Sequence, residues 1–292
     1  MKPYIEFKKQ RELGEILTDT FAFIKYEFKP FMKTILQLSG PYLVLFLVCM
    51  TFYTYTSGDM FDFSDPSGGF SDSFNPLMMF LAFVAFAISA ILVYTIAAST
   101  VLHYIKSYIE TKGEIDVMII KQDVKNTFWG FFGLSVLKWI MIFIAMLICI
   151  LPVFYMMVPM SVVLSIYVFE KRDVGDAFSY SFNLIKEEFW ITLATIIIIG
   201  LIVLVASYAF ALPASLYTMA KSGILSGELD PGNMQSFYDP VTMILNVISN
   251  LIQFLLNLIS TVGAVFIYFN LNERKHFSGT LDRIKSIGQI EE

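Results

Sequence analysis

Apolar runs of membrane-spanning length alternate with polar segments along the chain. The runs occupy residues 34–56, 77–104, 130–151, 152–169, 191–213 and 241–271. A helix needs about 20 mostly apolar residues to cross a bilayer. Backbone polar groups must be paired inside hydrocarbon, and these runs are too long and too uniform for barrel strands, so they predict helices. The expected fold class is an all-α polytopic membrane protein with six transmembrane helices in a single integral membrane domain, 1–292.

Two segments, 10–29 and 173–190, have an amphipathic pattern instead. In the second, apolar residues recur at the spacing of one helix face, at Val174, Ala177, Phe178, Phe182, Ile185 and Phe189. In the first, the same steps return at Leu13, Ile16, Leu17, Phe21, Ile24 and Phe28. A helix with one apolar and one charged face suits the plane of the membrane interface. We therefore expect both segments to form interfacial helices.

The two amphipathic segments also match each other in sequence at a shift of 161 positions. The identical pairs are Gly14 and Gly175, Phe21 and Phe182, Ile24 and Ile185, Lys25 and Lys186, Glu27 and Glu188, and Phe28 and Phe189. A membrane-length apolar run follows each copy. The pattern predicts internal repeats, each an interfacial helix that leads into a pair of spanning helices.

The distribution of Lys and Arg predicts the topology. Seven lie in the first 33 residues, four in the 106–129 connector, three between the fourth and fifth runs and four in the tail. The loops at 57–76 and 214–240 hold one between them, Lys221. Cytoplasmic segments carry the excess of basic residues. With six spans, we expect a multi-pass protein of the bacterial cytoplasmic membrane with the N- and C-termini cytoplasmic and those two loops outside.

Composition agrees with this placement and narrows the classes of function. The chain is 57% hydrophobic and 15% charged, whereas a soluble domain has about 25% charged residues. No basic surface for nucleic acid is visible, so the expected partner is the lipid bilayer, with a membrane-protein partner or a homo-oligomer left open. Cys49 and Cys149 lie inside apolar runs, and we interpret them as small buried hydrophobic residues. Nothing in the sequence favours a disulfide between them.

Motifs for catalysis, cofactors and metals were not found. The chain has no G-x-S-x-G elbow, H-E-x-x-H pair, P-loop or G-x-G-x-x-G turn. Its two histidines, His103 and His276, lie far apart and without a cluster of Cys or carboxylates, which argues against a metal site. We therefore predict a non-enzymatic protein without a cofactor or a metal.

Four amides form one stripe in the sixth apolar run. They are Asn246, Asn250, Gln253 and Asn257. Facing lipid, each would leave hydrogen-bonding groups unpaired, so the stripe should face other helices. Two interpretations stay open. The amides either form interhelical hydrogen bonds, which we favour because uncharged amides commonly hold membrane helices together, or line a path for a substrate or lipid headgroup.

One basic residue, Lys138, lies within the third apolar run. A Lys at the bilayer centre costs roughly 2.5–3.5 kcal/mol on insertion scales. Trp139 beside it favours a position near the interface, from which the ammonium group can reach water along its aliphatic stem. The sharper alternative is a contact between Lys138 and a lipid phosphate headgroup.

A short motif follows Val168 and consists of Glu170, Ala177, Ser181, Leu184 and Phe189-Trp190. In these residues the chain resembles the membrane domain that precedes the catalytic domain in some bacterial glycerophosphodiester phosphodiesterases and that also occurs alone. The resemblance implies a multi-span helical membrane domain. The catalytic domain with its His and carboxylate metal site is missing here, so phosphodiesterase activity does not transfer.

Two functions are compatible with these patterns. The first is a non-enzymatic membrane module, a scaffold or accessory subunit that docks a partner or lipid headgroups at the inner leaflet. The alternative is a permease or lipid-handling transporter that uses the polar stripe of the sixth run, since internal repeats are common among transporters.

Overall fold

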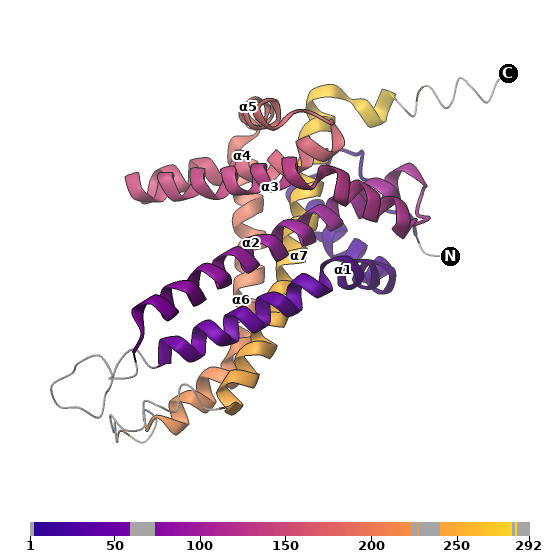
Figure 1. Cartoon of the computed structure of the whole chain (residues 1–292). Helices are drawn as coiled ribbons and strands as arrows, with labels where there is room; N and C mark the ends of the chain where they lie inside the picture. The colour runs from indigo at the N-terminus through magenta and orange to yellow at the C-terminus, as the bar shows by residue number, and fades with distance from the viewer. Residues whose placement is uncertain (1–2, 59–73, 224–226, 228–239, 282–283, 285–292) are drawn as a thin grey trace. The chain divides into compact units, whose positions relative to one another are not determined.

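The structure, a computed structural model, describes residues 3–58, 74–223, 227, 240–281 and 284 (Figure 1). Within them all regular secondary structure is helical. The helices are α1 (Leu13–Gly58), α2 (Pro76–Glu110), α3 (Val117–Ile148), α4 (Ile150–Phe169), α5 (Val174–Ile185), α6 (Phe189–Lys221) and α7 (Pro240–His276). By length and composition, six of them can cross a membrane, every one except α5. The predicted all-α polytopic fold is confirmed.

Several helix ends differ from the predicted boundaries. The first amphipathic segment and the first apolar run form one continuous helix, α1. α3 begins in the polar connector, because the Asp116 side chain caps it by accepting hydrogen bonds from the N–H groups of Met118 and Ile119. α6 continues past Pro213 to Lys221, so the second predicted loop starts later than expected. Most of both predicted outer loops lies outside the described residues.

The second amphipathic segment is divided between two helices. α5 ends at Ile185 rather than at residue 190, and α6 begins at Phe189. The three residues between them, 186–188, are all charged, and the N–H of Glu188 donates to the carbonyl of Ile185 over 3.1 Å. The tight turn lets the chain change direction between an amphipathic helix and an apolar one.

The chain forms two compact units, each assembled from separate stretches. Unit 1 comprises Met1–Ser39, Thr95–Ile202 and Leu258–Glu292; unit 2 comprises Gly40–Tyr94 and Val203–Asn257. Within unit 2, α1 packs on α2 through ring contacts of Phe46 and Tyr53 with Phe86, at centroid distances of 5.7 and 5.4 Å. Tyr94 meets Phe254 of α7 at 6.2 Å.

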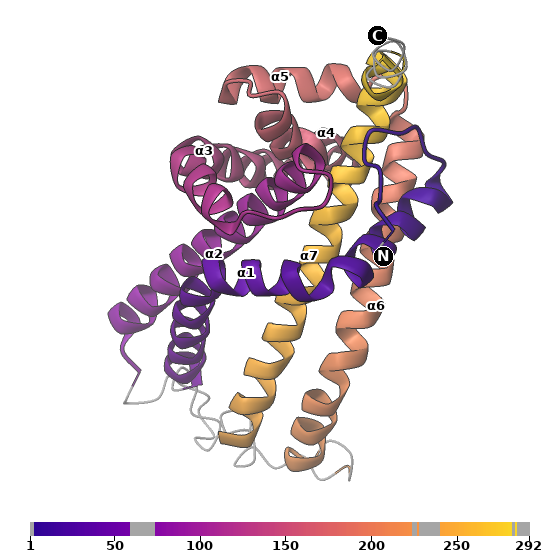
Figure 2. The ribbon, with the colours of Figure 1, turned by 90° about the vertical axis from the view of Figure 1, so that its right-hand side faces the viewer.

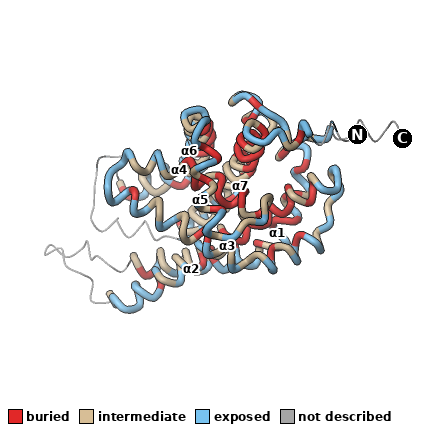
Figure 3. Tube along the Cα trace, turned by 90° about the horizontal axis from the view of Figure 1, so that it is seen from above, coloured by how far each residue is buried: buried red, intermediate tan, exposed pale blue. Residues whose placement is uncertain are grey.

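Unit 1 contains helices that run in different directions. α3 and α4 form a hairpin joined at Cys149, and α4 also packs on α5. In two views at right angles, this hairpin runs across the 258–276 part of α7 rather than along it (Figures 1 and 2). α5 and the 13–39 part of α1 also lie across that part of α7. The second half of α4, from Val158 onward, is largely buried (Figure 3).

Aromatic rings make up much of the core of unit 1. Phe7, from the segment before α1, stacks on Phe266 of α7 with centroids 4.4 Å apart and meets Phe23 of α1 edge-on at 5.2 Å. Phe31 of α1 packs against Tyr104 of α2, also at 5.2 Å. All five rings are almost completely buried. The N-terminal segment is therefore part of the core and not a free tail.

Both amphipathic segments bury residues at matching positions. At the shift of 161, the buried pairs are Ile16 and Ala177, Thr20 and Ser181, and Phe23 and Leu184. This face shares Ile16 and Ala177 with the apolar face predicted from the sequence but is turned away from the rest of it in α1, where Phe21 and Phe28 are exposed, 40% and 54%. An exposed apolar face on a helix segment that lies across the 258–276 part of α7 suits contact with lipid.

Candidate functional site

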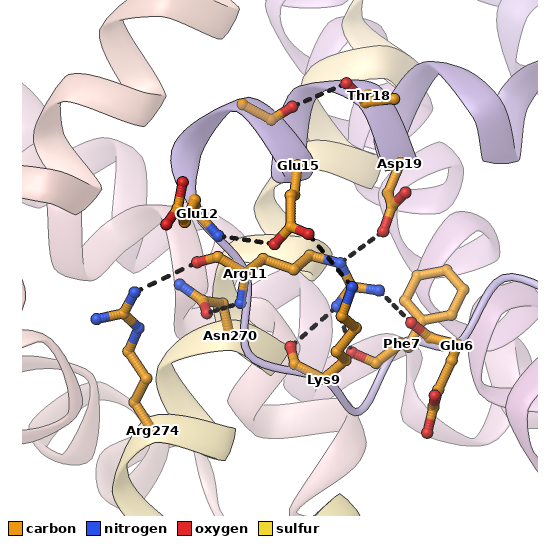
Figure 4. Close-up of polar contacts among 11 residues, drawn as sticks. Glu6, Phe7, Lys9, Arg11, Glu12, Glu15, Thr18, Asp19, Asn270 and Arg274 are labelled. Atoms are coloured by element: carbon orange, nitrogen blue, oxygen red, sulfur yellow. Dashed lines mark hydrogen bonds and ion pairs between the residues drawn. The ribbon is translucent and has the colours of Figure 1, made fainter.

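Arg11 organises the polar centre of unit 1 (Figure 4). The residue is only 3% exposed, and its Nε donates to an Asp19 carboxylate oxygen over 2.7 Å. The same guanidinium donates to the backbone carbonyls of Glu6, Phe7 and Lys9. A buried guanidinium must have its donors paired, and here they are paired by the turn that precedes α1. Arg11 thus fixes the shape of the N-terminal segment.

The last turns of α7 are tied to this segment. The N–H of Arg11 donates to Asn270 Oδ1 over 2.7 Å, and Arg274 Nη2 donates to the Arg11 carbonyl over 3.3 Å. Glu273, 1% exposed, accepts hydrogen bonds from the N–H groups of Gly279 and Thr280 over 2.7 and 2.9 Å. The chain therefore turns back on itself just after α7 ends.

A second polar group forms around α5. Tyr180 receives the Arg172 guanidinium on its ring face, 3.8 Å from the centroid, and its hydroxyl lies 2.7 Å from His276 Nε2. Arg172 Nε also donates to Glu170 over 2.6 Å, and this hydrogen bond raises the pKa of Arg172. Burial, followed by the nearby Glu170 carboxylate, raises the pKa of the Tyr180 hydroxyl. Both groups therefore hold their protons at neutral pH.

A pocket of about 250 Å³, named the charged pocket below, lies between these two groups. It is lined by Gln10, Asn183, Leu184, Glu187, Glu188, Leu271, Arg274 and Lys275. Two cations come from the end of α7 and two carboxylates from the turn between α5 and α6. Arg274 Nη1 pairs with Glu188 over 2.8 Å, and Lys275 Nζ donates to Asn183 Oδ1 over 2.8 Å.

Two charged groups of the charged pocket have unused bonding capacity. Arg274 Nε is buried and makes no hydrogen bond within the described part of the chain. Leaving a buried donor unpaired costs about 1–3 kcal/mol, and more when the group is charged. Glu187 is exposed and makes no hydrogen bond or ion pair with any described residue. The side chains of Arg274, Lys275 and Glu187 line the pocket, and among them the Glu187 carboxylate is free of described partners.

The charged pocket lies where two apolar helices become polar. Trp190, 77% exposed, and Ile191 follow directly after Glu188 and open the apolar run of α6. On α7, Leu271 is buried, and the basic residues of the last turn follow within a few positions. Tryptophan and basic residues gather at the level of the lipid headgroups. The pocket is therefore expected at that level.

The amide stripe predicted in the sixth run lies in unit 2, on α7. All four side chains are partly buried. Asn250 Nδ2 donates to the carbonyl of Asn246 over 2.8 Å, and Asn257 Nδ2 donates to the carbonyl of Gln253 over 2.9 Å. Both of these bonds run within the helix and not between helices. An amide that bonds to a carbonyl of its own helix leaves fewer of its hydrogen-bonding groups unpaired, so it can lie near apolar surroundings.

Lys138 lies in the middle of α3, in unit 1, and is partly buried. It makes no hydrogen bond or ion pair with the residues that the structure describes. Lys138, the candidate contact for a lipid phosphate headgroup, is not among the residues that line the charged pocket around Arg274. Among the same residues, no group of three or more His, Cys, Asp or Glu could hold a metal ion.

Sequence reasoning did not single out the charged pocket. From the sequence, Arg274 and Lys275 contribute only to the count of basic residues in the tail, and Glu188 only to the repeat, as the residue identical to Glu27. The signal was present, because opposite charges stand at the ends of two apolar runs. However, Glu188 and Arg274 are 86 positions apart, and only the fold shows that they meet.

The fold is that of an all-α integral membrane protein, and the described residues include six helices of membrane-spanning length. No family model, curated protein or solved structure matches the chain. Four of the residues behind the resemblance to the phosphodiesterase membrane domain make contacts inside unit 1, whereas Trp190 is exposed. Ala177, Ser181 and Leu184 form the buried face of α5, and Tyr268 donates to Glu170 over 3.2 Å.

Proposed function

We propose that the chain is a non-enzymatic integral membrane module, a scaffold or accessory subunit that docks a partner or lipid headgroups at the inner leaflet. One observation carries the proposal. The charged residues of unit 1 gather where α5 meets α6, where α7 ends and along the N-terminal segment, and they hold these parts together. Such a polar centre forms a rigid face at the ends of spanning helices, which suits docking.

The orientation of two helices supports this reading. α5 and the first part of α1 lie across α7 within unit 1, and the first part of α1 carries exposed aromatic residues such as Phe21. Helices of this kind rest in the interface plane. We further propose that they are the matching parts of an internal repeat, that they face the cytoplasm of a bacterial cell, and that the chain is related to the stand-alone phosphodiesterase-type membrane domain.

Site-specific photo-crosslinking in native membranes tests this function. A photoreactive side chain at Phe21 should capture lipid headgroups or one defined protein. The matched control is Val44, an exposed apolar position on the spanning part of α1. It should capture acyl chains only. Acyl-chain adducts alone at both positions would show that the amphipathic part of α1 lies within the hydrocarbon, and the docking role would fail.

The partly buried amide stripe of unit 2 favours a second candidate, a permease or lipid-handling transporter. If the stripe lines a path, Asn250→Leu combined with Asn257→Leu should abolish the flux of a solute in proteoliposomes while the protein still folds. Flux that depends on these two amides would show that the protein is a transporter and would refute the scaffold proposal. Flux at the background level for both the wild-type protein and the double variant would support the docking module.

A further inference from the structure

The charged pocket contains equal numbers of opposite charges. Arg274 and Lys275 stand against Glu187 and Glu188. A purely anionic ligand would meet the free carboxylate of Glu187, and a purely cationic ligand would meet the two basic residues. Both are disfavoured because like charges repel in a partly desolvated site. A ligand that carries both charges avoids this conflict.

The charged side chains that line the pocket specify the two ends of such a ligand. Arg274 and Lys275 supply the cationic end of the site, and guanidinium groups bind phosphate oxygens especially well. Glu187 can accept hydrogen bonds from a cation that carries N–H groups. The volume of about 250 Å³ is below the roughly 300–1,000 Å³ of pockets for drug-sized ligands. A small zwitterionic group fits it better than a whole lipid does.

We propose that the charged pocket binds a phosphoethanolamine group, with the phosphate on Arg274 and Lys275 and the primary ammonium on Glu187. The inference rests on the proposed docking function and names the headgroup that is docked. A phospholipid is the source we assign. Trp190, the apolar start of α6 and the basic last turn of α7 place the pocket at headgroup level, and Leu184 and Leu271 supply an apolar wall beside the charges.

Lipid competition on the full-length protein in nanodiscs tests the proposal. Bound lipids are identified by native mass spectrometry in mixtures of phosphatidylethanolamine, phosphatidylglycerol and phosphatidylcholine. Wild-type protein should retain phosphatidylethanolamine over the other two, since the second lacks a cation and the third lacks ammonium N–H donors. Glu187→Gln should lower that preference about tenfold, the effect of losing roughly one charge-assisted hydrogen bond.

The control variant is Asp176→Asn. Asp176 is an exposed acid in the first turn of α5 and does not line the pocket. The substitution removes the same charge from α5, the helix just before the turn that carries Glu187, and should leave the lipid preference unchanged. Glu187 has no partner among the described residues, so its substitution should not prevent folding. Equal retention of the three lipids by wild-type protein, or equal losses in both variants, would overturn the proposal.

Soluble glycerophosphoethanolamine separates the two sources of the ligand. If a lipid is the ligand, millimolar amounts of this headgroup should not displace it from the wild-type protein. Displacement at those concentrations would assign the pocket to a free zwitterion and overturn the lipid assignment. Failure here is distinguishable from failure of the docking module. A lost lipid preference with unchanged Phe21 adducts removes only the pocket proposal, whereas acyl-chain adducts at Phe21 remove the module itself.

Discussion

Arg11 Nε donates to the Asp19 carboxylate over 2.7 Å, although Arg11 is almost completely buried. The pair joins the segment before α1 to the second turn of that helix. Through its own N–H and carbonyl, Arg11 also bonds to Asn270 and Arg274 at the end of α7. One residue thus joins the segment before α1 to the end of α7 within unit 1.

Arg11→Met should lower the free energy of unfolding by about 2–3 kcal/mol. Breaking a buried pair costs about 3–5 kcal/mol, and we expect less here because Asp19 is partly exposed. Chemical unfolding in detergent micelles measures the loss. The control is Lys9→Gln, which breaks the 3.3 Å ion pair with Glu15, where both side chains are about half exposed. That variant should lose less than about 1 kcal/mol; similar losses in the two variants would refute a special role for Arg11.

Two glycines should respond to alanine in opposite directions. A Cβ at Gly279 would overlap the backbone carbonyl of Lys8, whereas a Cβ at Gly175 in α5 meets no atom within 4 Å. Gly279→Ala should therefore cost about 1–3 kcal/mol through overpacking. Gly175→Ala should stabilise the protein by about 0.5–1 kcal/mol by favouring the helix. Thermal unfolding in one detergent compares them, and a shift of the same sign in both would contradict the packing of Gly279 on Lys8.

The small residues of α5 should matter because of their size. Ser181 is completely buried and Ser179 is exposed on the same helix. Ser181→Leu should destabilise by about 1–3 kcal/mol through overpacking, while Ser179→Leu should change stability little. Chemical unfolding in detergent gives both values. If Ser181→Leu is tolerated as well as Ser179→Leu, the buried face assigned to α5 is incorrect.

Cys149 at the tip of the α3–α4 hairpin should be protected from water on both sides of the membrane. The residues around it are strongly apolar and highly exposed in the structure, among them Ile148 and Ile150. The hairpin also runs across α7 rather than along it. In a Cys49→Ser background, a membrane-impermeant maleimide should label Cys149 only after detergent is added.

A single cysteine in a described polar turn is the control for that experiment. Lys112→Cys, between α2 and α3, should be labelled from one face without detergent. Labelling of Cys149 from the opposite face would show that the hairpin crosses the bilayer completely, as the lengths of its two apolar runs predict. With either labelling result the two termini lie on the same side of the membrane, because the hairpin contributes two crossings or none.

The sequence by itself determined the fold class and the number of membrane-length helices. Apolar length and the demand for paired backbone groups act locally, so a run such as that in α2 predicts a helix without knowledge of its neighbours. The amphipathic pattern likewise identified α5. Its end at Ile185 was missed because the charged residues that follow still match the helical period.

Only the tertiary structure decided which helix faces pack together and which charges meet. In a membrane protein, lipid and protein interior are both apolar, so hydrophobicity cannot tell an outward Phe21 from an inward Phe23. The contacts of Arg274 with Glu188 and with Arg11 join residues 86 and 263 positions apart. Such contacts depend on how the helices fold back on one another, and the local periodicity of the sequence does not encode this packing.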